Sequence, residues 1–385
     1  MSVLTIIALL TFFQSIRSQE LIFANTVCRH GDRTIYRPYK TDPWGDVNFW
    51  PGGYGQLTNV GKRDCFELGK FFRKRYRGLL GDGSYSANKI YVESTDSDRA
   101  IASALTTMAA LFPPKEDAKF IEDFDWQPVP VHTSPAGSDY LLATQRSCDR
   151  FDLEMQQFLS ESYYKGLFKQ HWKLISYLER NSGSKINTLM DVMILYDALY
   201  VEQLKELCLP KWAEKVMISG GDFEYLALSV YPIHTSTTET KKIKGGYLLK
   251  SIFDRLTNKT KSTLSPDRSI HASFAHDMTI VNVLNSLGLY EVHQPPYSSC
   301  LLFELYKQND SHFVQLFYKK SAEPNGIQEL EFPSCGSKCT LEDLYEIYGD
   351  ILPTQPFDQE CALRYGEVLS PNGNPESYDI RKVQF

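Results

Sequence analysis

The chain has 385 residues, 42% of them hydrophobic and 23% charged, and its 41 Lys and Arg against 47 Asp and Glu give a formal net charge of −6. This composition excludes an intrinsically disordered chain and a polytopic membrane protein. The acidic balance also argues against nucleic acid as a partner. The most basic run, residues 70–77 (KFFRKRYR), is interleaved with aromatic residues and is typical of the solvated side of an amphipathic helix.

The N-terminus predicts a targeting segment. Residues 3–13 are uncharged and mostly apolar, but the run is far shorter than the ~20 residues that a membrane span needs. Polar residues 14–18 follow, and we expect a signal peptide over residues 1–18 with cleavage before Gln19. The alternative is a buried first strand. Because no later segment reaches spanning length, we expect a secreted, extracellular protein without a membrane anchor.

Glycosylation and disulfides would suit that location. Asn258 and Asn309 each open an Asn-x-Ser/Thr triplet and are predicted glycosylation sites. Eight cysteines in a secreted chain indicate disulfides, although their connectivity does not follow from the sequence. Cys335 and Cys339 flank a short loop. A local disulfide is favoured there over half of a zinc site, because no second Cys pair or nearby His completes one.

Strand and helix patterns alternate in the first part of the chain. The expected elements are a strand at 21–28, a helix from a Thr58 cap to about Tyr76, a strand at 89–93 and a helix at 94–112 ended by Pro113. This alternation indicates an α/β sheet.

The middle of the chain differs, because from about residue 148 to 231 the periodicity is helical nearly throughout. Strand character returns at 269–275, a helix follows to about Gly288, and residues 300–306 and 313–318 predict a hairpin. We therefore expect an α/β domain built from residues 19–125 and 255–385, with a smaller, mostly helical insertion at 126–254.

Arg29, His30 and Arg33 come at the end of the first predicted strand, which is where ligands bind in an open α/β sheet. Two guanidiniums around one imidazole would form an electropositive pocket, and their planar forks match phosphate oxygens. The imidazole could attack phosphorus or donate a hydrogen bond to phosphate. A surface turn in which Asp32 neutralises the arginines explains these residues equally well when they are taken alone.

Two more strand ends carry residues of the same kind. Arg99 opens the helix after the second strand, where helix amides also favour anions. His276 and Asp277 close a third strand. Separately, the Asp is an ordinary helix-capping residue, and the His an ordinary core residue. Together they would supply another phosphate donor and a proton for a leaving alkoxide.

These motifs, taken in order, resemble the histidine acid phosphatase family. The resemblance is carried by RHGDRT at residues 29–34, WPGGYGQLTNVGK at 50–62, the Arg99 region and the His276-Asp277 pair. Within the family the chain is most similar to secreted prostatic, lysosomal and venom acid phosphatases. It is less similar to phytases, which commonly have Pro where this chain has Ile35.

The resemblance implies a histidine-phosphatase-type α/β domain with an inserted helical domain. It also implies metal-independent hydrolysis of small phosphate monoesters, without a cofactor, with broad specificity and an acidic optimum. His30 would be the nucleophile that forms a phosphohistidine, and Asp277 would protonate the leaving group. The transferring phosphoryl group would be held by Arg29, Arg33, Arg99 and His276. A homodimer is an assembly expected by the same resemblance.

The family's disulfide pattern implies the pairs Cys148–Cys361, Cys208–Cys300 and Cys335–Cys339. Cys28 and Cys65 are left over, and they would be either a fourth bridge or two buried thiols.

Two other functions compete with a broad acid phosphatase. One is a catalytically inactive binding or toxin component on the same fold, which the presence of all six candidate residues disfavours. The other is a dedicated phosphatase for an inositol polyphosphate or a lysophosphatidate. The helical segment has no obvious basic cluster, which disfavours the inositol polyphosphate.

Overall fold

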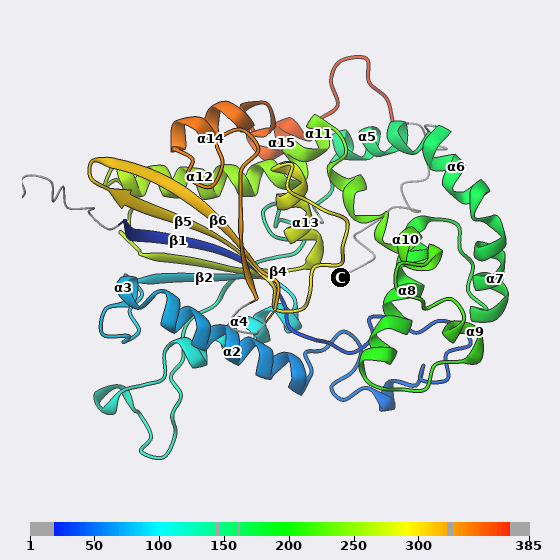
Figure 1. Ribbon diagram of the computed structural model, residues 1–385, viewed down its shortest axis with the longest axis horizontal. Coiled ribbons are helices and arrows are strands. Elements are labelled where there is room, and N and C mark those ends of the chain that lie inside the picture. The colour runs from blue at the N-terminus through cyan, green and yellow to red at the C-terminus, as the bar shows by residue number, and fades with distance from the viewer. Residues whose placement is uncertain (1–18, 144–145, 161, 322–325, 370–385) are drawn as a thin grey trace, which may run out of the picture.

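The computed structural model describes residues 19–143, 146–160, 162–321 and 326–369, so the expected signal peptide lies outside the described residues. At its centre is a seven-stranded sheet in the order β3-β2-β4-β1-β5-β6-β7. Figure 1 shows helices on both sides of this sheet, with α12 (Tyr247–Thr260) and α14 (Leu341–Tyr348) on one side and α2 (Asn59–Arg75) and α4 (Asp98–Leu111) on the other. The predicted α/β class is confirmed.

The sheet is mixed. Its strands are β1 (Glu20–Arg29), β2 (Ile90–Thr95), β3 (His132–Ser134), β4 (Ile270–Ala275), β5 (Cys300–Gln308), β6 (Ser311–Lys319) and β7 (Ile327–Leu330). The pairs β3·β2, β2·β4 and β4·β1 are parallel, and β1·β5, β5·β6 and β6·β7 are antiparallel. The predicted strands and the hairpin are confirmed to within a few residues. β3 was not predicted, because it has only three residues and all of them are exposed.

Helix α2 begins where the sequence predicts. The Thr58 side chain accepts a hydrogen bond from the Gly61 backbone N–H and so satisfies one free amide of the first turn. Gly61 also lets α2 approach the loop after β1, because a Cβ there would lie 2.3 Å from the Asp32 carbonyl oxygen. Glycine at this position therefore sets how closely α2 supports the loop that follows β1.

Helices dominate the next part of the chain. They are α5 (Asp149–Ser160), α6 (Ser162–Gln170), α7 (Trp172–Ser182), α8 (Leu189–Leu204), α9 (Lys211–Glu214) and α10 (Asp222–Leu228). They lie to the right of the sheet in Figure 1 and share a hydrophobic cluster that includes Leu189, Leu199 and Phe223. The helical periodicity predicted for residues 148–231 is confirmed.

The expected boundaries at 126 and 254 do not coincide with the ends of the sheet elements. β3 pairs with β2, and α12 buries Leu249 and Phe253 in the cluster formed with the sheet strands. β3 and the first part of α12, which includes both of these residues, lie within the range assigned to the insertion. The division into two domains stays a prediction.

The remaining elements are η1 (Val47–Phe49), α3 (Arg77–Leu80), η2 (Glu116–Ala118), η3 (Tyr231–Thr235), α11 (Thr238–Lys241), η4 (Lys242–Gly246), α13 (Asp277–Ser286), η5 (Gly349–Ile351) and α15 (Phe357–Glu360).

Two of the three implied disulfides form as expected, namely Cys148–Cys361 and Cys335–Cys339. The third, Cys208–Cys300, is wrong. Cys28 and Cys300 are direct partners in the β1·β5 ladder, with Cα atoms 4.1 Å apart, and they form the bridge instead.

The β1·β5 pairing also decides the state of the two remaining cysteines. Cys208 is an exposed free thiol and Cys65 a buried one, so a bridge between Cys28 and Cys65 is excluded as well. The Cys28–Cys300 bridge is fixed by the register between β1 and β5, two strands far apart in the sequence. The spacing of the cysteines along the chain does not reveal that register.

Both predicted glycosylation sites are accessible. Asn258 is exposed near the end of α12, and Asn309 is exposed in the β5–β6 turn. Their glycosylation stays a prediction.

A pair of carboxyl groups links α8 to the long loop after β1. Glu202 on α8 is fully buried and faces Asp42 of the loop. Neither Glu202 oxygen has another hydrogen-bond partner in the part of the chain that the structure describes. Burial first, and then the facing carboxyl group, raise the pKa of Glu202, and burial raises that of Asp42. The Glu202–Asp42 pair therefore keeps a proton at pH values where exposed carboxyl groups have lost theirs.

This pair predicts that the fold is more stable at acidic pH. A carboxyl group whose folded pKa is raised binds its proton more tightly in the folded state. The free energy of unfolding should then fall as pH rises from the ordinary carboxyl range through the raised value. In Glu202→Gln, which keeps a donor toward Asp42 but does not titrate, the fall between pH 5 and pH 8 should shrink by about 1–2 kcal/mol.

Urea unfolding followed by circular dichroism at both pH values measures this difference. Glu214→Gln on α9, an exposed position, is the control and should keep the wild-type dependence on pH. Identical behaviour of the two variants would show that the Glu202 carboxyl does not carry the effect.

Candidate active site

All six candidate residues meet at one edge of the sheet. Strands β2, β4 and β1 are parallel neighbours, so their carboxyl ends lie together. Arg29 ends β1, Arg99 is the second residue of α4 just after β2, and Asp277 opens α13 just after β4. Each of the six side chains is buried, with at most 5% of its surface exposed; they are Arg29, His30, Arg33, Arg99, His276 and Asp277.

The proton on the His30 ring is assigned by one hydrogen bond. The Nδ1 atom lies 2.8 Å from the Gly31 carbonyl oxygen, which can only accept. Nδ1 therefore carries the hydrogen, and Nε2 carries the lone pair. Nε2 is buried and makes no hydrogen bond to any described residue. The adjacent backbone carbonyl thus orients the His30 ring, and the lone pair of Nε2 faces the site without a hydrogen bond to the described residues.

The surroundings of His30 keep its ring neutral. Burial, followed by the charges of Arg99 and Arg29, lowers the pKa of His30 well below its ordinary value. A further positive charge is unfavourable in a desolvated site that already contains guanidiniums. His30 therefore keeps its lone pair in mildly acidic solution, where an exposed histidine would be protonated.

Both carboxyl oxygens of Asp277 are engaged by neighbouring groups. One oxygen lies 2.8 Å from Arg29 Nη2 and accepts a hydrogen bond from the Tyr231 hydroxyl at 3.2 Å. The other accepts from the Met278 backbone N–H at 2.8 Å. A ligand that engages Arg29 would therefore compete with the first of these contacts.

The three arginines differ in how their charge is balanced. Arg33 Nη2 contacts both oxygens of Asp197, at 2.8 and 3.0 Å, and Arg29 is paired with Asp277. Burial and the nearby Arg33 lower the pKa of Arg99 to about 9, so Arg99 still remains charged at acidic pH. Three guanidiniums and two carboxylates leave net positive charge in a buried site, which favours an anion.

His276 is engaged at both ring nitrogens. Arg99 Nη2 donates to Nδ1 at 3.4 Å, so Nε2 carries the hydrogen and donates to Thr95 Oγ1 at 3.0 Å. Burial and the arginines lower the pKa of His276. In this arrangement neither nitrogen is free to donate to a phosphate. For His276 to donate a hydrogen bond to a bound phosphate, its Nε2–H would therefore have to leave Thr95 Oγ1.

Asp32 does not neutralise the arginines. Its side chain pairs with Lys205, which caps the C-terminal end of α8, and accepts a hydrogen bond from Thr58. The surface-turn interpretation of residues 29–34 is therefore wrong, because Asp32 is engaged elsewhere and the arginines face the buried site.

Three residues of the site were missed by sequence reasoning. Asp197 lies on α8, Tyr231 on η3, and Tyr297 in the segment before β5, where its ring stacks 4.1 Å from the Arg29 guanidinium carbon. Each lies far along the chain from the residue that it contacts. No motif surrounds any of them, so only the tertiary structure reveals their positions.

The residues that the structure describes include no group of three or more His, Cys, Asp or Glu side chains arranged to hold a metal ion. None of the helices in the described ranges is long and apolar enough to cross a membrane.

Comparison with known proteins agrees with this geometry. The sequence pattern of the histidine phosphatase superfamily (branch 2) matches residues 20–319. Prostatic acid phosphatase of Homo sapiens is 36% identical over 371 residues, which are 95% of this chain and 93% of that protein. Prostatic acid phosphatase of Bos taurus is 34% identical, with 94% of each chain covered. Lysosomal acid phosphatase of Rattus norvegicus is 33% identical, covering 90% of this chain and 82% of that one.

Solved structures with a similar fold include two phytases. The enzyme from Klebsiella sp ASR1 has a TM-score of 0.67 and 17% identity, covering 92% of this chain and 100% of that one. Hafnia alvei phytase in complex with tartrate has a TM-score of 0.68 and 16% identity, covering 90% and 100%. At these identities the likeness shows a shared fold.

The charge balance predicts how the site binds inorganic phosphate. Arg99→Met leaves two guanidiniums that are each already paired with a carboxylate, so the site loses its net positive charge. Calorimetric titration at pH 5.5 should show phosphate affinity falling about 10- to 100-fold. Arg73→Met on α2, whose guanidinium donates to the Leu111 carbonyl, removes one charge elsewhere and is the control. Equal affinity in both variants would contradict the assignment.

Proposed function

The chain belongs to branch 2 of the histidine phosphatase superfamily, and on that premise we propose that it is an acid phosphatase that hydrolyses phosphate monoesters through a phosphohistidine on His30. One observation carries the proposal. The Nε2 lone pair of His30 is buried and unengaged by the described residues, and it stays unprotonated in acid beside three guanidiniums.

The first step transfers the phosphoryl group to His30. Nε2 attacks phosphorus as the bond from phosphorus to the ester oxygen breaks, and the departing alkoxide takes a proton from Asp277. The guanidiniums stabilise negative charge on the equatorial oxygens, and they are in place before the reaction. The hydrogen bond from Nδ1–H to the Gly31 carbonyl supports the ring as it gains positive charge.

The second step hydrolyses the intermediate. Water attacks phosphorus, the bond to Nε2 breaks and returns the lone pair to His30, and the water proton passes to the Asp277 carboxylate. Inorganic phosphate leaves, and the site returns to its starting protonation state. In this scheme Asp277 serves first as the acid and then as the base.

The alternatives have less support. An inactive binding or toxin component would lack part of the reactive set, whereas all six side chains meet in the site. The phytase alternative is supported by shared fold, because the Klebsiella sp ASR1 and Hafnia alvei phytases resemble this chain at 17% and 16% identity. The relatives at 33–36% identity are named acid phosphatases. We therefore favour small phosphomonoesters as substrates over inositol polyphosphates or lysophosphatidate.

Secretion follows from the same premise. The apolar run at residues 3–13, the exposed acceptors Asn258 and Asn309 and the disulfides all suit the secretory pathway. We propose a secreted glycoprotein that starts at Gln19 and assembles as a homodimer. Membership of the venom group stays a prediction. N-terminal sequencing, deglycosylation and light scattering of protein from the culture medium test these points.

Loss of the nucleophile tests the reaction itself. His30→Ala should reduce hydrolysis of p-nitrophenyl phosphate by at least about 10⁴-fold, while EDTA leaves the wild type unaffected because guanidiniums supply the charge stabilisation. Rapid quenching into alkali should trap a phosphorylated protein in the wild type only. His312→Ala on β6 is the control.

The lowered pKa of His30 adds a dependence on pH. Since the ring stays neutral below its ordinary range, wild-type activity should be retained at pH 5. An acid limb near pH 6.5, or activity indifferent to His30, would contradict the proposal.

The proton donor is tested by varying the leaving group. Asp277→Asn cannot protonate a departing oxygen, so hydrolysis of an alkyl ester such as glycerol 2-phosphate should fall about 10²- to 10⁴-fold. p-Nitrophenoxide leaves with little need of a proton, so its ester should lose less than about tenfold. Equal losses on both substrates would instead assign Asp277 to positioning Arg29.

A further inference from the structure

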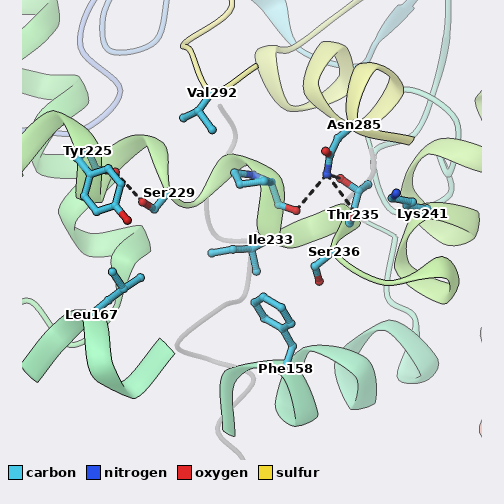
Figure 2. A pocket seen from close by; sticks show the side chains of 11 residues that line it. Phe158, Leu167, Tyr225, Ser229, Ile233, Thr235, Ser236, Lys241, Asn285 and Val292 are labelled. Atoms are coloured by element: carbon cyan, nitrogen blue, oxygen red, sulfur yellow. Dashed lines mark hydrogen bonds between the residues drawn. The ribbon is translucent and has the colours of Figure 1, made fainter. Parts of the chain in front are cut away.

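A cavity of about 450 Å³ lies outside the active site, among the helices beside the sheet. Its volume lies in the range typical of small-molecule sites, ~300–1,000 Å³. It is lined from several elements, including Phe158 of α5, Leu167 of α6, Ile233 of η3 and Asn285 of α13. Figure 2 shows these side chains arranged around it.

The cavity has one charged end, and at the other end the hydroxyl groups of Tyr225 and Ser229 interrupt an otherwise apolar lining. In Figure 2 Lys241, Thr235 and Asn285 lie together at one end, and Tyr225 and Leu167 lie at the other. Phe158 and Val292 lie on opposite sides between these ends. A molecule that fits this lining has a polar head and a hydrocarbon body.

The charge at the Lys241 end selects the head group. Lys241 makes no ion pair with the residues that the structure describes, whereas its neighbour Lys242 lies 4.0 Å from Glu239. A single ammonium suits a monoanion. A phosphate or sulfate ester is more often held by the planar fork of Arg, and no Arg lines the cavity.

The cavity shares two elements with the active site. Ile233 and Pro232 of η3 line it, and Tyr231 of the same short helix donates to Asp277. Asn285, at the other end of the helix that Asp277 opens, donates to the Pro232 and Thr235 carbonyl oxygens at 3.3 and 3.1 Å. A molecule seated here therefore touches the segment that places the Tyr231 hydroxyl.

We propose that this cavity binds a medium-chain aliphatic carboxylate, with its head at Lys241 and its chain along Ile233, Leu167 and Phe158, and that its occupancy acts on Asp277 through Tyr231. The second half rests on the proposed phosphatase function, and the first does not.

Binding is tested by calorimetric titration of the full chain with decanoate, below the concentration at which it forms micelles. We expect saturable binding of one decanoate per chain. Lys241→Gln should weaken it about fivefold, and Lys242→Gln, which removes the same charge one residue away, should not. Ser236→Trp, a bulky substitution at an exposed position of the rim, should prevent binding.

Two binding results would overturn this half of the proposal. One is equal binding of decanoate and uncharged decanol together with no effect of Lys241→Gln. The other is binding of decanoate only after removal of residues 370–385, which lie outside the described residues and would then be the occupant.

The coupling is tested by kinetics. Saturating decanoate should change kcat for p-nitrophenyl phosphate by about twofold or more in the wild type and in Lys242→Gln. In Tyr231→Phe, which lacks the hydroxyl that reaches Asp277, decanoate should still bind in the calorimeter but leave kcat as it is without ligand. The same change of kcat in Tyr231→Phe would overturn the coupling. Calorimetry reads binding without any catalysis, so failure of the phosphatase proposal is distinguishable.

Discussion

The burial of three guanidiniums at one sheet edge is the constraint on which the rest of the site depends. Taking a charge out of water is costly unless it is paired, and unpaired guanidiniums at this density would oppose folding. Asp197 and Asp277 compensate two of them, at 2.8 Å each. Three guanidinium charges face two carboxylates, so the site remains electropositive. This residual charge keeps His30 neutral and favours a phosphate.

Helix α8 is essential to that balance although it lies outside the sheet. Asp197 pairs with Arg33, Lys205 pairs with Asp32, and Glu202 faces Asp42. All three partners lie in the loop that follows β1, so one helix fixes the course of the chain around His30. The helices beside the sheet therefore hold its arginine loop in place.

The sequence predicts the frame of the site, but not the groups that balance its charge. Arg29, Arg99 and Asp277 could be placed because each follows a predicted strand, and parallel strands present their ends at one edge. Asp197 and Tyr231 could not be placed, because they lie in helical segments whose packing is decided by tertiary contacts. The Cys28–Cys300 bridge was missed for the same reason, since it depends on the register of two strands that are 272 residues apart.

Two buried groups, His30 and Glu202, have pKa values that are shifted in the direction that keeps each uncharged in mild acid. Burial shifts the pKa of His30 down and that of Glu202 up, because it disfavours a cation in one case and an anion in the other. Both groups are then uncharged in mild acid, where the histidine keeps its lone pair and the carboxyl pair holds its proton. Above that range His30 stays neutral while the pair between α8 and the arginine loop loses its proton. The upper pH limit of the active conformation should therefore be set by the scaffold that holds Arg33, and not by the ionisation of His30.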